Sequence, residues 1–185
     1  MKLFIASDIH GSMHYCKKML EAFHREGADK LVLLGDVLYH GPRNDLPKEY
    51  NPKQVIELLN NIKDKILSTR GNCDTEVDQM VLDFPVLPEY GVFFDNYVTV
   101  YICHGHNKET IEKSLPQGSY LICGHTHVPK AMDCKTYFYL NPGSVSIPKE
   151  NSPHGYMVYE NGVFTWKNLE GEIYNTLKAG EKNED

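Results

Sequence analysis

The sequence predicts an α/β fold in which two β-sheets pack as a sandwich with helices outside. Three observations support this prediction. The first half alternates short apolar runs with amphipathic stretches, as in a βαβαβ unit with mostly parallel strands. The second half is rich in β-forming runs separated by turn residues. The 185 residues suffice for one sizeable core and are too few for a long multidomain assembly.

The first half contains three expected strands and two expected helices. An apolar run at its start, and two later runs that end in polar turn residues, have the length of buried strands. Between them, apolar side chains recur at helical spacing, and Gly27 is placed to end the first helix. We expect strands at residues 2–7, 31–34 and 65–69, and helices over residues 16–23 and 55–62.

The second half predicts mainly hairpins. Its expected strands cover residues 92–94, 97–103, 120–123, 137–140, 156–159 and 163–166. The pair Asn161-Gly162 between the last two is a strong hairpin signal. From Gly171 the sequence is polar, so we expect one domain over residues 1–170 and a polar C-terminal tail over residues 171–185.

Composition narrows the class of protein. The chain is 41% apolar and 24% charged, and it has no run long enough to span a membrane and no apolar stretch suited to secretion. We therefore expect a cytoplasmic protein without a membrane partner. The net charge of -6 argues against a nucleic-acid partner. The five cysteines form no C-x-x-C pair, so we expect reduced thiols.

Residue types that bind metals follow five of the expected strands. The carboxyl ends of strands are where open α/β sheets bind ligands. Side chains two apart in extended backbone point the same way, so the paired members of one block can face one pocket. Imidazole, carboxylate and amide donors suit manganese, iron, nickel, cobalt or zinc. The blocks are Asp8-x-His10, Gly35-Asp36, Gly71-Asn72-Cys73-Asp74, His104-Gly105-His106 and Gly124-His125-x-His127.

In this order, the five blocks resemble the motifs of the calcineurin-like metallophosphoesterases. The resemblance covers residues 2–148, and residues 36–44, 70–80 and 141–148 are similar to small bacterial phosphodiesterases of that superfamily. It implies an α-β-β-α sandwich with two divalent metal ions, manganese first and iron, nickel, cobalt or zinc as alternatives. The implied ligands are Asp8, His10, Asp36 and His127 for one metal, and Asp36, Asn72, His104 and His125 for the other.

The charge of such a site suits phosphate chemistry. Two divalent ions, two aspartates and a bridging hydroxide leave a net charge of about +1, which can hold phosphate oxygens while the hydroxide attacks phosphorus. The resemblance implies a phosphoric diester hydrolase for small phosphodiesters that forms a homo-oligomer, a dimer or a tetramer. His104, Asn72 and Cys73 are the candidate catalytic residues.

Cys73 departs from the wider superfamily. Most of its phosphatases resemble G-N-H-D/E at this block, and that histidine is the usual leaving-group acid. A thiol is a poorer acid at neutral pH, so we expect a preference for phosphodiesters. The alternatives are a phosphomonoesterase or protein phosphatase, and a non-enzymatic scaffold of the same fold, which the seven intact ligand positions disfavour.

Three further residues are weaker candidates. Arg43 lies in the polar loop after Asp36, where its guanidinium can either bind phosphate or stay in solvent. His106 is either a substrate contact or a hydrogen-bond partner or plain residue of its loop. We expect Asp74 to orient its neighbours and not to bind metal.

Overall fold

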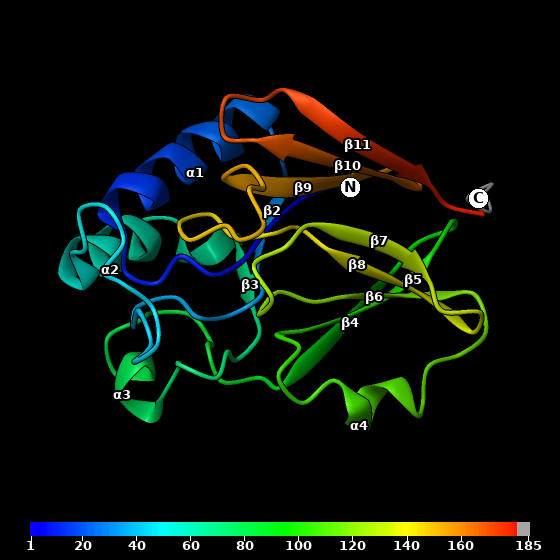
Figure 1. The fold of residues 1–185 in the computed structure, drawn as a ribbon, viewed down its shortest axis with the longest axis horizontal. Helices are drawn as coiled ribbons and strands as arrows, with labels where there is room; N and C mark the ends of the chain where they lie inside the picture. Colours follow the sequence, from blue (N-terminus) through cyan, green and yellow to red (C-terminus); the bar gives the residue numbers. More distant parts are fainter. Residues whose placement is uncertain (181–185) are drawn as a thin grey trace.

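The computed structural model describes residues 1–180 and arranges them in two mixed β-sheets (Figure 1). One sheet contains β1 (Lys2–Ala6), β2 (Lys30–Leu33), β3 (Ile66–Ser68), β9 (Gly155–Glu160), β10 (Val163–Asn168) and β11 (Ile173–Lys178). The other contains β4 (Tyr90–Phe94), β5 (Thr99–Cys103), β6 (Ser119–Ile122), β7 (Lys130–Asp133) and β8 (Tyr137–Asn141). Their orders are β11-β10-β9-β1-β2-β3 and β4-β5-β6-β8-β7. The predicted two-sheet sandwich is confirmed.

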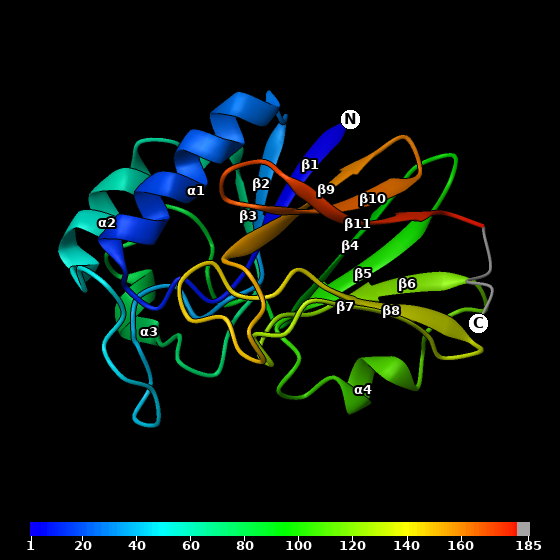
Figure 2. The same cartoon turned by 45° about the horizontal axis from the view of Figure 1, so that its top comes forward.

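The helices cover the outer faces of this sandwich. Figures 1 and 2 show α1 (Met13–Glu26) and α2 (Pro52–Asn60) beside the first sheet, and the short α4 (Glu109–Glu112) beside the second. The small α3 (Glu76–Gln79) and the 3-10 turn η1 (Lys63–Lys65) complete the set within residues 1–180. Gly27 ends α1 in the left-handed conformation, with φ of 60°, as predicted.

Side chains of β1 alternate between two cores. Phe4 and Ala6 pack against the helices, while Leu3 and Ile5 face the second sheet. The core between the sheets also contains Trp166, which is fully buried. Because β1 is buried on both faces, its sequence is a continuous apolar run.

Parallel strands form one side of the first sheet and the centre of the second. β1, β2 and β3 run parallel, and so do β5, β6 and β8. The expectation of mainly hairpins in the second half is therefore wrong for β5, β6 and β8. The chain between them is long enough for the crossovers that parallel pairing needs, which contain α4 and β7. Hairpin pairing holds for β4 with β5, β7 with β8 and β9 with β10.

The polar tail expected from Gly171 is wrong for residues 173–178. These residues form β11, which pairs with β10, and Leu177 is buried in the core between the sheets. The other residues of this edge strand are exposed, so the sequence shows almost no apolar alternation there. Residues 181–185 of the expected tail lie outside the described residues. No helix within residues 1–180 has the length and apolarity needed to cross a bilayer.

Candidate metal centre

Five parallel strands, from both sheets, lead directly into the residues that the sequence singled out. Each block follows the carboxyl end of its strand, as predicted. The first sheet brings two carboxylates, an amide and one imidazole, and the second sheet brings the remaining imidazoles. Asp8 and His10 follow β1, Asp36 follows β2, Asn72 follows β3, His104 follows β5, and His125 and His127 follow β6.

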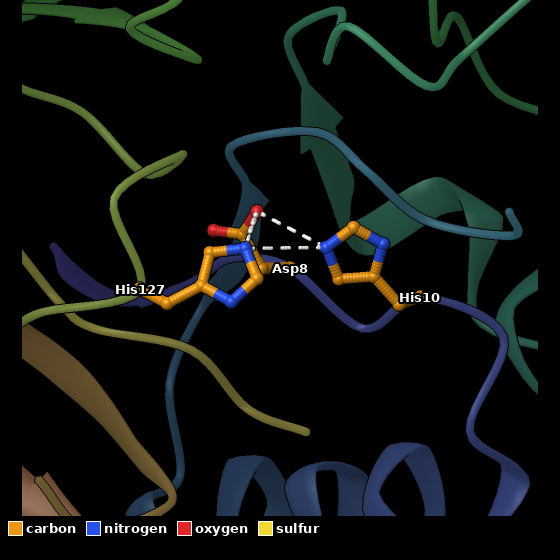
Figure 3. A group of neighbouring side chains, drawn as sticks. All are labelled: Asp8, His10 and His127. Atoms are coloured by element: carbon orange, nitrogen blue, oxygen red, sulfur yellow. Dashed lines mark hydrogen bonds and ion pairs between the residues drawn. The ribbon is translucent and has the colours of Figure 1, made fainter. Parts of the chain in front are cut away.

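Asp8, His10 and His127 form a compact group (Figure 3). The Nε2 atoms of His10 and His127 lie 3.5 Å and 3.2 Å from Asp8 Oδ1. These two nitrogens are 3.3 Å apart. Asp36 Oδ2 lies 3.7 Å from His10 Nε2, so this carboxylate borders the group. All four side chains are buried.

A second group gathers around His104. Its Nε2 atom lies 3.4 Å from Asp36 Oδ2 and 3.1 Å from Asn72 Oδ1. The ring of His125 is 5.1 Å from the His104 ring, centroid to centroid. Asp36 therefore stands between the two groups. The structure brings all seven predicted ligand side chains into one cluster.

The backbone of these residues is not extended. The φ angles are positive at Asp8 (59°), His10 (49°), Asp36 (54°), His125 (67°) and His127 (62°). Our reason for the shared direction of the paired side chains, an extended strand, is therefore wrong. A left-handed conformation costs a residue other than glycine about 1–3 kcal/mol and is concentrated at functional sites. The strain supports a functional role for this turn geometry.

Two glycines let the strand ends approach closely. A Cβ atom on Gly71 would lie 2.1 Å from Asp36 Oδ1. A Cβ atom on Gly124 would lie 1.9 Å from Ser7 Oγ and 2.8 Å from Asp8 Oδ2. No real side chain fits either space, so both positions require glycine.

Main-chain carbonyls fix the tautomer of three imidazoles. The Nδ1 atoms of His10, His104 and His127 each lie within hydrogen-bond distance of a carbonyl oxygen. Because a carbonyl only accepts, each Nδ1 carries a proton, and in the neutral ring each Nε2 presents its lone pair to the cluster. The acceptors are, in the same order, the oxygens of Tyr39 at 2.7 Å, Leu34 at 2.6 Å and Ile147 at 2.7 Å.

This arrangement fits divalent cations. The lone pairs of His10 and His127 face each other, and the buried Asp8 Oδ1 has no hydrogen-bond donor among the described residues. Burial by itself raises the pKa of Asp8, but the adjacent imidazoles of His10 and His127 hold that pKa well below its usual value. Burial likewise lowers the pKa of His104, yet the neighbouring carboxylates raise it to about 9. The cluster attracts positive charge, and its nitrogen and oxygen donors suit borderline divalent metals.

Asp74 stabilises the turn at Asp36. Its carboxylate accepts the backbone N–H groups of Asp36 at 2.8 Å, Val37 at 2.9 Å and Gly71 at 2.7 Å. These contacts use both carboxylate oxygens. Asp74 therefore orients the β2 and β3 turns.

Two serines that the sequence interpretation did not identify stabilise the β1 turn. Ser144 Oγ donates to the Asp8 carbonyl at 2.9 Å, and Ser146 Oγ lies 3.0 Å from the same oxygen and 2.7 Å from the Ile9 carbonyl. Asn141 Nδ2 donates to the Gly124 carbonyl at 2.7 Å and so holds the β6 turn. The sequence signal that could have identified these three residues is the run Asn-Pro-Gly-Ser-Val-Ser, which begins at the last residue of β8.

A cavity of about 470 Å³ opens above the cluster. Arg43 is exposed on its wall, and Cys73 is half-buried there. Burial and the nearby Asp36 carboxylate raise the pKa of the Cys73 thiol, which therefore stays neutral. The sequence interpretation did not identify three other lining residues, Asn44, Thr126 and Lys149.

His106 lies beside a second cavity of about 300 Å³. This cavity is also lined by His104, Glu89 and Glu109. The ring of His106 is 5.5 Å from that of His104 and 6.2 Å from that of His125. The structure therefore places Arg43 and His106 at different cavities that share the histidine cluster.

The chain is similar to known phosphoesterases in sequence and in structure. The family model described as "Calcineurin-like phosphoesterase superfamily domain" matches residues 1–162. Phosphodiesterase YfcE of Escherichia coli K12 is 46% identical over 167 residues, covering 89% of this chain and 90% of that protein. Phosphodiesterase MJ0936 of Methanocaldococcus jannaschii is 26% identical over 152 residues, covering 77% and 83%.

Solved structures agree with this similarity. The structure of YfcE, a phosphoesterase from E. coli, matches with a TM-score of 0.89 and 42% identity, covering 97% of this chain and 100% of that chain. Vacuolar Protein Sorting 29 from Cryptosporidium parvum matches with a TM-score of 0.64 and 16% identity, covering 96% of this chain and 97% of that chain. At this identity the match shows only that the two folds are similar.

Proposed function

Because the chain belongs to the calcineurin-like phosphoesterase superfamily, we propose that it is a metal-dependent hydrolase of small phosphodiesters. One observation carries this proposal. Two buried carboxylates, an amide and four imidazoles converge from five strand ends, with Asp36 between the two groups. Similarity to YfcE and MJ0936, both named phosphodiesterases, supports a diester as the substrate.

The cluster would hold two divalent cations. When bound, such a pair polarises phosphate oxygens and lowers the pKa of water. Asp36 lies within 3.7 Å of His10 and 3.4 Å of His104, which supports its role as the shared ligand. One cation would take Asp8, His10, Asp36 and His127, and the other would take Asp36, Asn72, His104 and His125. Manganese is our first candidate, with iron, nickel, cobalt and zinc as alternatives.

The protein's own groups would orient the substrate. Arg43, which lines the cavity, would bind a free oxygen of the scissile phosphate with its guanidinium fork. His104 and Asn72, which lie 3.1 Å apart, would hold the reacting centre, and the neutral thiol of Cys73 would donate a hydrogen bond to the leaving oxygen. His106 would contact an ester arm that enters the second cavity, which it lines.

Three finer features extend the resemblance. We propose a single catalytic domain, which includes β11 because that strand pairs with β10. We also propose a cytoplasmic location and a homo-oligomer of two or four subunits. Light scattering of the purified protein, coupled to size exclusion, measures the oligomer directly.

Metal removal tests the proposed function. Protein stripped by a chelator is assayed with bis(p-nitrophenyl) phosphate and p-nitrophenyl phosphate, before and after single metals are restored. We expect two metal ions per chain at full activity, no turnover without them, and a higher kcat/KM for the diester. Full turnover by the stripped protein would contradict metal dependence. Faster hydrolysis of the monoester would support the phosphomonoesterase alternative.

A further inference from the structure

Two cationic side chains border the 470 Å³ cavity from opposite loops. Arg43 belongs to the loop after β2, and Lys149 belongs to the loop after β8. Both are exposed, and neither side chain makes a hydrogen bond or ion pair with another residue of the described part of the chain. Lys167, by contrast, is paired with Glu26 at 2.8 Å. The two cations at the cavity are available to a ligand.

The backbone on both sides of this cavity is well anchored. The Lys149 N–H group donates to the His127 carbonyl at 3.2 Å. The Lys149 carbonyl in turn accepts from the backbone N–H group and the hydroxyl of Ser152, at 3.0 Å and 2.6 Å. On the other wall, Asn44 Nδ2 donates to the His40 carbonyl at 2.8 Å beside Arg43. Both charges therefore start from fixed main-chain positions.

The charge of the cavity exceeds the charge of a simple diester. Asp36 is the one carboxylate among its described lining residues, and it belongs to the metal cluster. The cluster itself carries a net charge of about +1 when loaded with two divalent ions and a hydroxide. Arg43 and Lys149 add two further positive charges, whereas a phosphodiester carries one negative charge. Although the chain has a formal charge of -6, positive charge is concentrated at this site.

The neighbouring cavity lacks the positive charge of the first. Glu89 and Glu109 line it, and its described lining includes neither lysine nor arginine, although Glu89 Oε1 lies 3.7 Å from Arg70 Nη1 outside the lining. An anionic group on the substrate is therefore favoured on the Lys149 side of the cluster and disfavoured on the Glu109 side. Because the two cavities differ in charge, an anionic ester arm should prefer the Lys149 side and an uncharged arm the Glu109 side.

We propose that Lys149 binds a second phosphate group carried on one alcohol arm of the diester substrate, while Arg43 binds the scissile phosphate. The inference rests on the proposed function and adds the substrate class, a phosphodiester that also bears a phosphate monoester. The uncharged arm lies toward Glu89 and Glu109. Lys149 is thus a residue that determines substrate preference.

Two substrates with the same leaving group test this inference. They are the p-nitrophenyl esters of thymidine 5′-phosphate with and without a 3′-phosphate, assayed with the fully metal-loaded protein. We expect kcat/KM to be about tenfold higher for the 3′-phosphorylated ester, the size of one charge-assisted contact. Lys149→Gln should bring the ratio close to one, and Lys149→Arg should preserve it. Lys17→Gln, an exposed lysine of α1, is the matched control and should leave the ratio unchanged.

Calorimetry gives a readout that does not need turnover. Thymidine 3′,5′-bisphosphate should bind about tenfold more tightly than thymidine 5′-monophosphate, and Lys149→Gln should remove the difference. Equal kcat/KM for the two esters and equal affinities for the two nucleotides in the unsubstituted protein would overturn the inference. If neither ester is hydrolysed but the bisphosphate still shows Lys149-dependent binding, the proposed function fails and the phosphate site stands.

Discussion

The two sheets supply different chemistry to one cluster. The first sheet provides both carboxylates, the amide and His10, and the second provides His104, His125 and His127. Within residues 1–180, the oxygen donors of the predicted ligand set thus come from one layer, and three of its four imidazoles come from the other. Neither sheet alone holds a complete site.

This division links the site to the packing of the sandwich. Asp8 and Asp36 are 0% and 2% exposed, and the imidazoles beside them come mostly from the facing sheet. Two buried carboxylates without that sheet would repel each other and lack compensation. The site therefore forms only when the two sheets pack against each other in their native arrangement. Substitutions in one sheet, at the junction of the sheets or at the edge of a sheet should affect it to different degrees.

The largest effect is expected from the first sheet, at the carboxylate between the two groups. Asp36→Asn removes one negative charge from the place where both cations need it, so turnover of a diester should fall by about 10³-fold or more. Because the amide has nearly the same shape, the melting temperature should stay close to that of the unsubstituted protein. Kinetics, metal analysis and thermal denaturation of the same sample check this. Normal metal content with normal turnover would remove Asp36 from the ligand set.

The junction of the sheets comes next. Gly124→Ala places a Cβ atom 1.9 Å from Ser7 Oγ, so the β6 turn must move away from β1. We expect a loss of about 1–3 kcal/mol in the free energy of unfolding and of about 10²-fold in turnover. Gly91→Ala on the edge strand β4 is the control, since its Cβ would meet only the Ile102 side chain at 3.2 Å. Equal effects of both substitutions would argue against a special role of the junction.

A smaller effect is expected from the hydrogen bonds that hold the β1 turn. Ser146→Ala deletes the donor to the Asp8 and Ile9 carbonyls, while Ser144 still binds the Asp8 carbonyl. Turnover should fall by about tenfold through weaker metal binding, with a stability loss of about 1 kcal/mol. Metal titration followed by calorimetry measures the affinity. An unchanged metal affinity would show that Ser144 suffices.

Substitution of Cys73 should change substrate selectivity more than the overall rate of turnover. Cys73→His introduces a better acid at the cavity wall, so leaving-group protonation should improve more for monoesters than for activated diesters. We expect the ratio of kcat/KM for diester over monoester to fall roughly three- to tenfold. The two p-nitrophenyl substrates measure this ratio, with metal content checked. An unchanged ratio would shift attention to the loop over residues 40–51.

The smallest effect on turnover is expected far from the cluster. Leu177→Ala in β11 removes a buried side chain from the core between the sheets and should cost about 2 kcal/mol of stability. Turnover at room temperature should be unchanged, because β11 is an edge strand that carries no ligand. Ile173→Ala, which is 62% exposed in the same strand, is the control and should not change the melting temperature. A loss of turnover in Leu177→Ala would show that the edge influences the site.

The sequence was most informative where one signal was sufficient by itself. Continuous apolar runs identify β1 and β2, and Gly27 marks the end of α1. The order of metal-binding residue types identifies the cluster, because each type follows a strand and strands end at the same edge of a sheet. The edge strands β7 and β11 were missed, since most of their residues are exposed and lack a period of two.

Long-range features could not be derived in this way. The parallel pairing of β5, β6 and β8 depends on crossovers whose direction the local sequence does not specify. The left-handed turns at Asp8 and His127 are stabilised by distant residues, so local propensity argues against them. Lys149 lines the cavity through a loop whose backbone bonds to the distant His127 carbonyl.

The carbonyl acceptors of the three imidazoles have a consequence for sequence variation. The oxygens of Tyr39, Leu34 and Ile147 belong to the main chain, so the side chains at these positions do not set the tautomers. Substitutions of the exposed Tyr39 and the partly exposed Ile147 should therefore leave the proton positions in the cluster unchanged. In a saturation library, both positions should tolerate most residues. Proline at position 40 should be rejected because it restricts the backbone of Tyr39 and displaces its carbonyl, whereas position 148 after Ile147 is already proline. At these positions the backbone conformation, and not the identity of the side chain, preserves the proton positions of the site.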